Sequence, residues 1–165
     1  MKHLRVLPHH PPTGYQTSVP KNLAKATAIV AGPSHTCVLT PSMPSEIVCW
    51  GYNLYGQILP SVDLGVTIAL ATGEQLTCGV DDTGDGTCWG RWVQNDLPMG
   101  LGALRTVATG DDFGCGVKTT GYVECWGAPD YGQTAVPADL DIVVSLSSAG
   151  HHSCAITTSS APGEC

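Results

Sequence analysis

The stretch VATGDDFGC at residues 107–115 decides the fold of this 165-residue chain, because the chain repeats it. The pattern of an apolar run, a Gly or Ala turn and a cysteine occurs four times, as IVAGPSHTC (29–37), LATGEQLTC (70–78), VATGDDFGC (107–115) and LSSAGHHSC (146–154). The copies are 41, 37 and 39 residues apart. A period of about 40 residues indicates one small unit that buries its apolar surface against the next copy, as in propellers, solenoids and arrays.

Two further features keep the same register. A glutamine stands 16 residues before the turn Gly or Ala of each copy, at Gln16, Gln57, Gln94 and Gln133. A second cysteine leads into Trp-Gly in three copies, Cys49-Trp50-Gly51, Cys88-Trp89-Gly90 and Cys125-Trp126-Gly127, and the fourth copy has Cys165. We therefore divide residues 14–165 into four repeats, 14–56, 57–93, 94–132 and 133–165.

The composition favours strands over helices. Twenty Gly and 12 Pro residues interrupt short apolar runs. No segment shows the sustained i, i+3, i+4 spacing of an amphipathic helix. The predicted class is all-β, with four β-propeller-type blades built from repeats of about 39 residues, each blade having four strands.

The eight cysteines fall two to a repeat, and each pair flanks a turn-rich linker. If residues 119–121 form a three-residue turn, Cys115 and Cys125 lie directly opposite each other, within reach of a disulfide. The predicted bridges are Cys37–Cys49, Cys78–Cys88, Cys115–Cys125 and Cys154–Cys165. Reduced thiols and zinc are the less favoured alternatives; structural zinc sites usually draw cysteines from a C-x2-4-C knuckle, which the sequence lacks.

Disulfides persist outside the reducing cytosol, so the cysteine usage predicts an extracellular, periplasmic or cell-envelope location. Residues 1–13 are rich in Pro and His and are predicted to form a disordered arm. Pro8, Pro11 and Pro12 interrupt any apolar core of a signal peptide. No run approaches 18 apolar residues, and no membrane span is predicted.

The repeat resembles the regulator of chromosome condensation family in its short, bacterial, cysteine-containing form. The residues that carry the resemblance are Ala31-Gly32, His35-Thr36-Cys37, Cys49-Trp50-Gly51 and Tyr55-Gly56-Gln57. The resemblance covers residues 14–165 and implies β-propeller blades, but no single function, since such propellers include nucleotide-exchange factors, chromatin binders and enzyme inhibitors. Members usually close seven blades, so a closed four-bladed ring and an arc of a larger propeller both stay open.

Single residues carry little candidate chemistry. His35 and His152 share one repeat position, where Leu76 and Phe113 stand in the other copies. A position that accepts all three residue types indicates packing or partner contact rather than catalysis. Residues 81–86, DDTGDG, resemble a calcium loop but lack the bidentate Glu of an EF-hand, and a hairpin tip is the favoured interpretation. No catalytic residue, metal ligand or cofactor is predicted, and the chain is not expected to be an enzyme.

Charge narrows the partners. Fourteen acidic and seven basic residues give a formal net charge of −7, which would repel nucleic acid. The turns of the four copies differ while the flanking Gly and Cys positions hardly change, as a recognition surface requires. We expect a non-enzymatic extracellular or envelope module that binds a protein or glycan through one propeller face. The expected contact residues are His35, Leu76, Phe113, His152 and Trp92, with Phe113 as the aromatic anchor.

The alternative function is structural. An arc of blades exposes strand edges and blade faces, and such surfaces favour association. In this interpretation the chain is a homo-oligomeric subunit that self-assembles through its exposed blade faces into rings or fibres.

Overall fold

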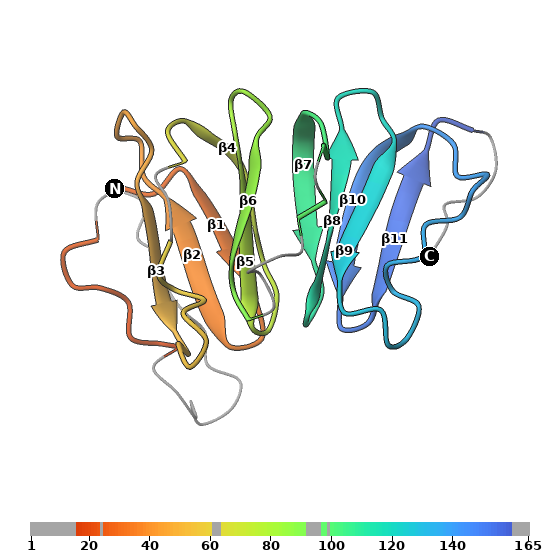
Figure 1. The fold of residues 1–165 in the computed structure, drawn as a ribbon. Coiled ribbons are helices and arrows are strands. Elements are labelled where there is room, and N and C mark those ends of the chain that lie inside the picture. The colour runs from red at the N-terminus through yellow and green to blue at the C-terminus, as the bar shows by residue number, and fades with distance from the viewer. Residues whose placement is uncertain (1–15, 24, 61–63, 92–96, 99, 160–165) are drawn as a thin grey trace.

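The computed structural model describes residues 16–23, 25–60, 64–91, 97–98 and 100–159, and within them it has strands and no helix (Figure 1). In this part of the chain there is therefore no helix long and apolar enough to cross a membrane. The strands are β1 (Ala28–Ala31), β2 (His35–Leu39), β3 (Ile47–Gly51), β4 (Thr67–Thr72), β5 (Leu76–Asp81), β6 (Gly86–Gly90), β7 (Leu104–Thr109), β8 (Phe113–Lys118), β9 (Val123–Gly127), β10 (Val143–Ala149) and β11 (His152–Thr157).

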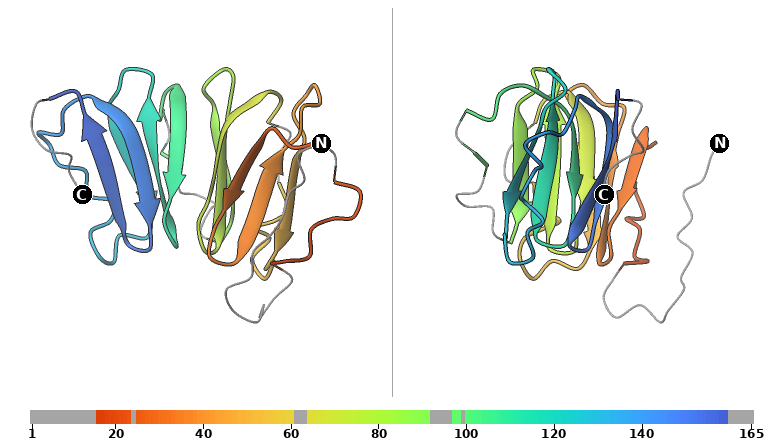
Figure 2. Two further views of the ribbon diagram at one scale, coloured as in Figure 1. Left: turned by 180° about the vertical axis from the view of Figure 1, so that it is seen from behind. Right: turned by 90° about the vertical axis from the view of Figure 1, so that its right-hand side faces the viewer.

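The strands pair with their neighbours in sequence as antiparallel hairpins. This gives four sheets, which we call blades 1 to 4: β1-β2-β3, β4-β5-β6, β7-β8-β9 and β10-β11. The blades stand in a row, with blade 1 and blade 4 at its two ends (Figures 1 and 2). The predicted all-β class with propeller-type blades is confirmed, and within the described residues the ring is incomplete.

Each described blade has at most three strands, rather than the four predicted. The segment after the Trp-Gly pair, which would supply the fourth strand and includes Tyr55-Gly56-Gln57 in the first repeat, runs instead as a series of turns. Gly56 and Gly132 in this segment take φ values of +80° and +78°. Pro60 and Pro137, which follow, have no N–H to donate to a strand ladder. The segment therefore leaves its own sheet and contacts the next blade.

Three disulfides cross blades 1 to 3. Cys37 pairs opposite Cys49, Cys78 opposite Cys88 and Cys115 opposite Cys125, with Cα–Cα distances of 4.0 to 4.1 Å. In blade 3, Gly121 of the predicted turn at residues 119–121 takes a φ of +91°, which lets the chain return in this register. Three predicted bridges are confirmed. The fourth predicted bridge, Cys154–Cys165, stays a prediction because Cys165 lies outside the described residues.

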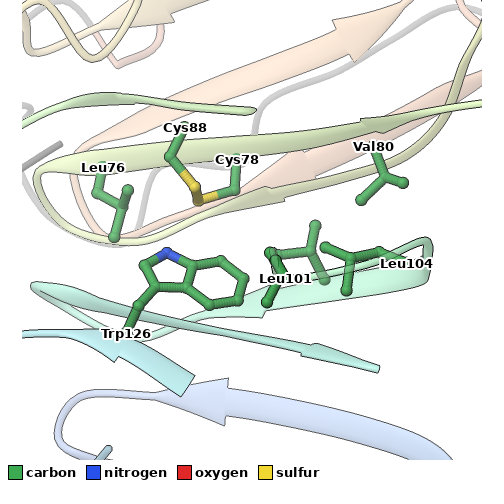
Figure 3. Packing of buried hydrophobic residues seen from close by; sticks show 8 residues of the cluster. Leu76, Cys78, Val80, Cys88, Leu101, Leu104 and Trp126 are labelled. Atoms are coloured by element: carbon green, nitrogen blue, oxygen red, sulfur yellow. A yellow bond between two sulfur atoms is a disulfide. The ribbon is translucent and has the colours of Figure 1, made fainter. Parts of the chain in front are cut away.

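The core lies between blades. Trp126 of blade 3 packs against the Cys78–Cys88 disulfide of blade 2, among apolar side chains from both blades (Figure 3). Gly114 makes room for the indole, because a Cβ there would lie 2.9 Å from the ring. The other two repeat tryptophans, Trp50 and Trp89, are only 4% and 3% exposed. The recurring Trp is therefore a packing residue.

The recurring glutamine ties each connecting segment to the blade that follows. The Trp89 indole Nε1 donates to the main-chain oxygen of Gln57 at 3.0 Å, and Trp50 Nε1 donates to that of Gln16 at 2.9 Å. The glutamine side chain closes its own turn, since Oε1 of Gln57 and of Gln133 accepts a backbone N–H at 3.0 and 2.8 Å. The fixed spacing of the glutamines thus reflects a carbonyl that must reach the indole of its own repeat.

The turn glycines set the distance between blades. A Cβ at Gly32 would lie 2.4 Å from the oxygen of Gly73, one at Gly73 would lie 1.9 Å from that of Gly110, and one at Gly110 would lie 2.6 Å from that of Gly150. Only glycine lets neighbouring backbones approach this closely. Blade 4 has Ala149 at this position, and its side chain is exposed because no described blade follows.

We expect Gly73→Ala to lower the free energy of unfolding by ~2 kcal/mol or more, because the added methyl group meets the backbone of Gly110 rather than a flexible side chain. Ala149→Gly is the matched control at the equivalent position and should change it by less than about 1 kcal/mol. Urea unfolding followed by tryptophan fluorescence measures both. Equal losses in the two variants would contradict this account of blade spacing.

Candidate binding face

The turns between the first and second strands of the blades lie along one edge of the row, the lower edge in Figure 1. The loops that follow the third strands leave from the same edge, because Gly51 at the end of β3 pairs with His35 at the start of β2. We call this surface the turn face and define it by residues 32–34, 52–55, 73–75, 91, 110–112, 128–131 and 150–151.

Hydrogen bonds join the turns of successive blades into a fixed row. Ser34 Oγ donates to the oxygen of Glu74 at 2.6 Å. The backbone N of Gln75 donates to the oxygen of Asp111 at 3.3 Å, and Asp111 N donates to that of Gly150 at 2.9 Å. Each turn is thus positioned by the next blade, so the row is a rigid frame rather than a set of independent loops.

The loops after the third strands are held against these turns. Tyr52, Arg91 and Ala128 each donate a backbone N–H to a turn carbonyl of their own blade, at 2.9, 2.9 and 3.1 Å. The preceding glycine of each Trp-Gly pair takes a φ between +106° and +118°, and a Cβ there would lie 2.2 to 2.6 Å from a turn oxygen. The Gly of the Trp-Gly signature therefore positions the loops of the turn face.

Exposed rings gather where blades 3 and 4 meet. Tyr131, from the loop after β9, is 72% exposed. Its ring centroid lies 4.5 Å from that of His151 in the turn of blade 4, with the planes tilted by 36°. Leu54 and Tyr52 are also exposed, on the loop of blade 1. Aromatic groups held on a rigid frame are typical of protein-binding surfaces.

Carboxylates outnumber cations on the described part of the turn face. The carboxylates are Glu74, Asp111, Asp112 and Asp130. The cation is Arg91, whose Nη1 donates to Gln75 Oε1 at 2.8 Å and whose guanidinium lies 5.0 Å from the Tyr55 ring centroid. Such a face favours neutral or basic partners and repels polyanions.

The structure corrects the predicted contact residues. His35, Leu76 and Phe113 are 1%, 3% and 0% exposed, so they lack the exposure that a contact residue needs. They begin the second strand of their blades and point into the gap before the next blade, where they pack. His152 is exposed because no described blade follows blade 4. Trp92 lies outside the described residues.

His35 forms a buried polar link between blades 1 and 2. Thr77 Oγ1 donates its one proton to the oxygen of Gln57 at 2.8 Å, so His35 Nε2 must donate to Thr77 Oγ1 at 2.7 Å. The other ring nitrogen, Nδ1, is buried with no hydrogen-bond partner among the described residues. Burial lowers the pKa of His35 from 6.5 to about 4, so the ring is neutral at physiological pH.

Residues 81–86 form a hairpin tip, as the favoured interpretation of the DDTGDG stretch predicts. Asp81 Oδ1 accepts hydrogen bonds from Thr83 N, Thr83 Oγ1 and Asp85 N at 2.7 to 2.9 Å. The Thr83 hydroxyl, with these backbone groups, lowers the pKa of Asp81. The carboxylate thus stabilises its own turn. Within the described residues no group of three or more His, Cys, Asp or Glu side chains could hold a metal ion.

The sequence did not reveal the Tyr131–His151 pair. Tyr131 shares its repeat position with Tyr55, which is half-buried under Arg91. His151 directly precedes His152, the histidine at the repeat position of His35. The two rings come from different repeats, so no spacing within one repeat relates them. The signal that was present is the exposure expected of a Tyr between Asp130 and Gly132 in a turn.

A regulator of chromosome condensation (RCC1) repeat matches residues 105–133. The match runs from β7 through the Trp-Gly of β9 to Gln133, which is blade 3 with its loop. The resemblance to this repeat family predicted from the sequence is confirmed.

Solved structures share the fold of the whole row. The chain is similar to the ectodomain of the Physcomitrella patens receptor kinase CR4, with a TM-score of 0.76 and 21% identity over 92% of this chain and 43% of that one. It is similar to Saccharomyces cerevisiae Prp20p, with a TM-score of 0.67 and 19% identity over 84% and 45%. It is also similar to the CRINKLY WD40 ectodomain of the Arabidopsis thaliana receptor kinase ACR4, with a TM-score of 0.57 and 20% identity over 90% of this chain and 66% of that one. The chain thus spans less than two thirds of each of these relatives.

We expect the neutral His35 to make stability depend on acidity. In the unfolded chain His35 takes up a proton near pH 6.5. In the folded protein its pKa is about 4, so the ring stays neutral until the pH approaches that value. The stabilising contribution is therefore complete above pH 6.5 and is lost as the pH falls from 6.5 to 4, amounting to roughly 2 to 3 kcal/mol by pH 4.5. Urea unfolding at pH 7.5 and 4.5 measures this loss, and His35→Leu should reduce it by that amount. An identical pH dependence in the variant would exclude the role.

Proposed function

Residues 105–133 are a regulator of chromosome condensation repeat within a row of propeller-type blades, and from this premise we propose that the chain is a non-enzymatic interaction module. It binds a protein partner through its turn face. The observation that carries the proposal is the exposed Tyr131–His151 pair, which two blades hold in place between carboxylate-bearing turns. A protein surface with neutral and basic side chains complements this face, and a glycan is the alternative ligand.

The similar structures support binding as the role of the fold. Prp20p is described together with its binding to Gsp1p and histones, and yeast RCC1 (Prp20) was solved bound to Kap60. These are partners of that protein. For the present chain they support only a general role in holding a protein on a propeller scaffold.

An extracellular or envelope setting also belongs to the proposal. The described residues hold three disulfides, which persist in an oxidising compartment. Two of the similar structures are ectodomains of receptor kinases. A partner is therefore best sought among secreted proteins and the exposed parts of membrane proteins.

A second candidate is the self-assembling structural subunit. It is favoured by the outer face of blade 4, where Ile156 is 60% exposed and no described blade covers His152. Other features of this face oppose continued stacking. Ser145 and Ser147 stand where blade 2 has alanines, and Ala149 replaces the glycine that close approach requires.

We therefore expect a monomer at all accessible concentrations. Light scattering coupled to size-exclusion chromatography tests this, and a mass that grows with concentration would favour assembly.

The interaction module is tested by paired variants at opposite edges of the row. Wild-type chain is screened against arrays of extracellular proteins and of glycans. Combined Tyr131→Ala and His151→Ala changes should weaken binding to any partner found by about tenfold or more, because exposed aromatic anchors dominate interface energetics. Tyr122→Ala is the matched control, since Tyr122 is also exposed but lies at the opposite hairpin tips. Equal effects of the two changes, or no effect of the first, would place the binding site elsewhere.

A further inference from the structure

Blades 1 to 3 differ at one position of the turn face, the last residue of the turn between the first two strands. This residue is Ser34 in blade 1, Gln75 in blade 2 and Asp112 in blade 3. In each blade its main-chain oxygen accepts the N–H of the residue that follows Trp-Gly, at 2.9 to 3.1 Å. The two positions are thus paired alike in the three blades, so their side chains can be compared.

Blade 2 holds an arginine of its own at this pair of positions. The guanidinium of Arg91 donates from Nη1 to Gln75 Oε1 at 2.8 Å and lies 5.0 Å from the Tyr55 ring centroid. The acceptor in this pair is a neutral amide oxygen. The turn face of blade 2 therefore contains a small guanidinium site that the chain fills with its own side chain.

Blade 3 has an acceptor at the same place without the arginine. Asp112 stands at the position of the glutamine and Ala128 at that of the arginine. Among the described residues no hydrogen bond or ion pair reaches the Asp112 carboxylate, and its Oδ1 is buried without a partner. In blade 1, by contrast, Ser34 Oγ donates to the oxygen of Glu74. A carboxylate that has lost part of its hydration and has no partner is costly, and a cation that pairs with it offsets this cost.

The Asp112 carboxylate can be reached from the turn face. Asp112 and Ala128 are both partly exposed, and the short side chain of Ala128 leaves room that the longer arginine fills in blade 2. A carboxylate shares its charge between its two oxygens, so a cation that approaches from the surface also compensates the buried one. Asp111 directly precedes Asp112, and Asp130 follows Ala128 by two residues. These neighbours add negative charge and attract a cation to the site.

We propose that Asp112, beside Ala128, is the binding site for an arginine side chain of a protein partner. The inference rests on the proposed function, since it names the partner chemistry of the turn face. A guanidinium is more weakly hydrated than an ammonium group and forms charge-assisted hydrogen bonds with a carboxylate, which favours arginine over lysine. A metal ion fits poorly, because the described residues offer no group of three or more ligating side chains.

A random-peptide phage library is the probe, selected on the oxidised full-length chain. We expect the recovered peptides to share an arginine. Replacing that arginine by citrulline, which has nearly the same shape but no charge, should weaken binding at least about tenfold in fluorescence anisotropy, because the charge-assisted hydrogen bond is lost. The proposal is overturned if arginine is not enriched over the unselected library, or if the citrulline peptide binds equally well.

Two variants of the chain locate the arginine. Asp112→Asn keeps the shape of the side chain and removes its charge, whereas Ala128→Arg supplies a guanidinium from the chain itself, as in blade 2. Each should weaken binding of the recovered peptides at least about tenfold. Thr120→Arg is the matched control, since it adds the same charge at the exposed hairpin tip of the same blade, and it should leave binding intact. If one of the two variants fails to fold, the other decides, and wild-type affinity in a folded variant overturns the proposal.

A separate measurement distinguishes this site from the aromatic pair of the turn face. The combined Tyr131→Ala and His151→Ala change is assayed against the array partner. If that partner binds normally while the peptides depend on Asp112, the role of the aromatic pair fails and the arginine site stands. If the peptides bind the Asp112→Asn chain normally while the array partner loses affinity for the combined variant, the arginine site fails and the proposed function stands.

Discussion

The Trp126 indole, packed on the Cys78–Cys88 disulfide, is the contact on which the arrangement of the blades depends. Each sheet is only two or three strands wide in the described residues, and no strand is shared between sheets. A sheet of this size does not bury enough apolar surface to be stable alone. Stability must therefore come from the gaps between blades, where a large aromatic ring faces a compact apolar disulfide.

The residues that recur in the repeat all serve this interface. The turn glycine allows the backbones of neighbouring blades to approach, and the main-chain oxygen of the glutamine accepts the indole N–H. The glycine after Trp takes a positive φ, which lets the following loop pack against the turn of the same blade. These requirements leave the loop and turn side chains free to vary. The turn face can therefore carry recognition chemistry without disturbing the scaffold.

Much of the fold could be predicted because its signals are periodic and local. The cysteine spacing across a short turn predicted the register of β8 and β9. The contact residues could not be found from variation alone, since variation does not say which side of a strand a residue occupies. The alternation of side chains along a strand does give this side. Leu76 is two residues before Cys78 and therefore lies on the same buried side of the strand. The Tyr131–His151 pair depends on two repeats meeting in space, which no period within one repeat records.

The two faces of blade 4 differ in what they can accept. Its outer face has two serines and Ala149 in place of the small apolar residues and glycine that allow a blade to stack closely, so adding a further blade there would bury hydroxyl groups and bring a methyl group against a backbone carbonyl. Its inner side lines a cavity against blade 3, with Cys125 of blade 3 and Ala155 of blade 4 among the lining residues. Stacking a further blade on the outer face requires a wider spacing than the turn glycines allow between blades 1 to 4. The chemistry of this end of the row therefore disfavours extending the row.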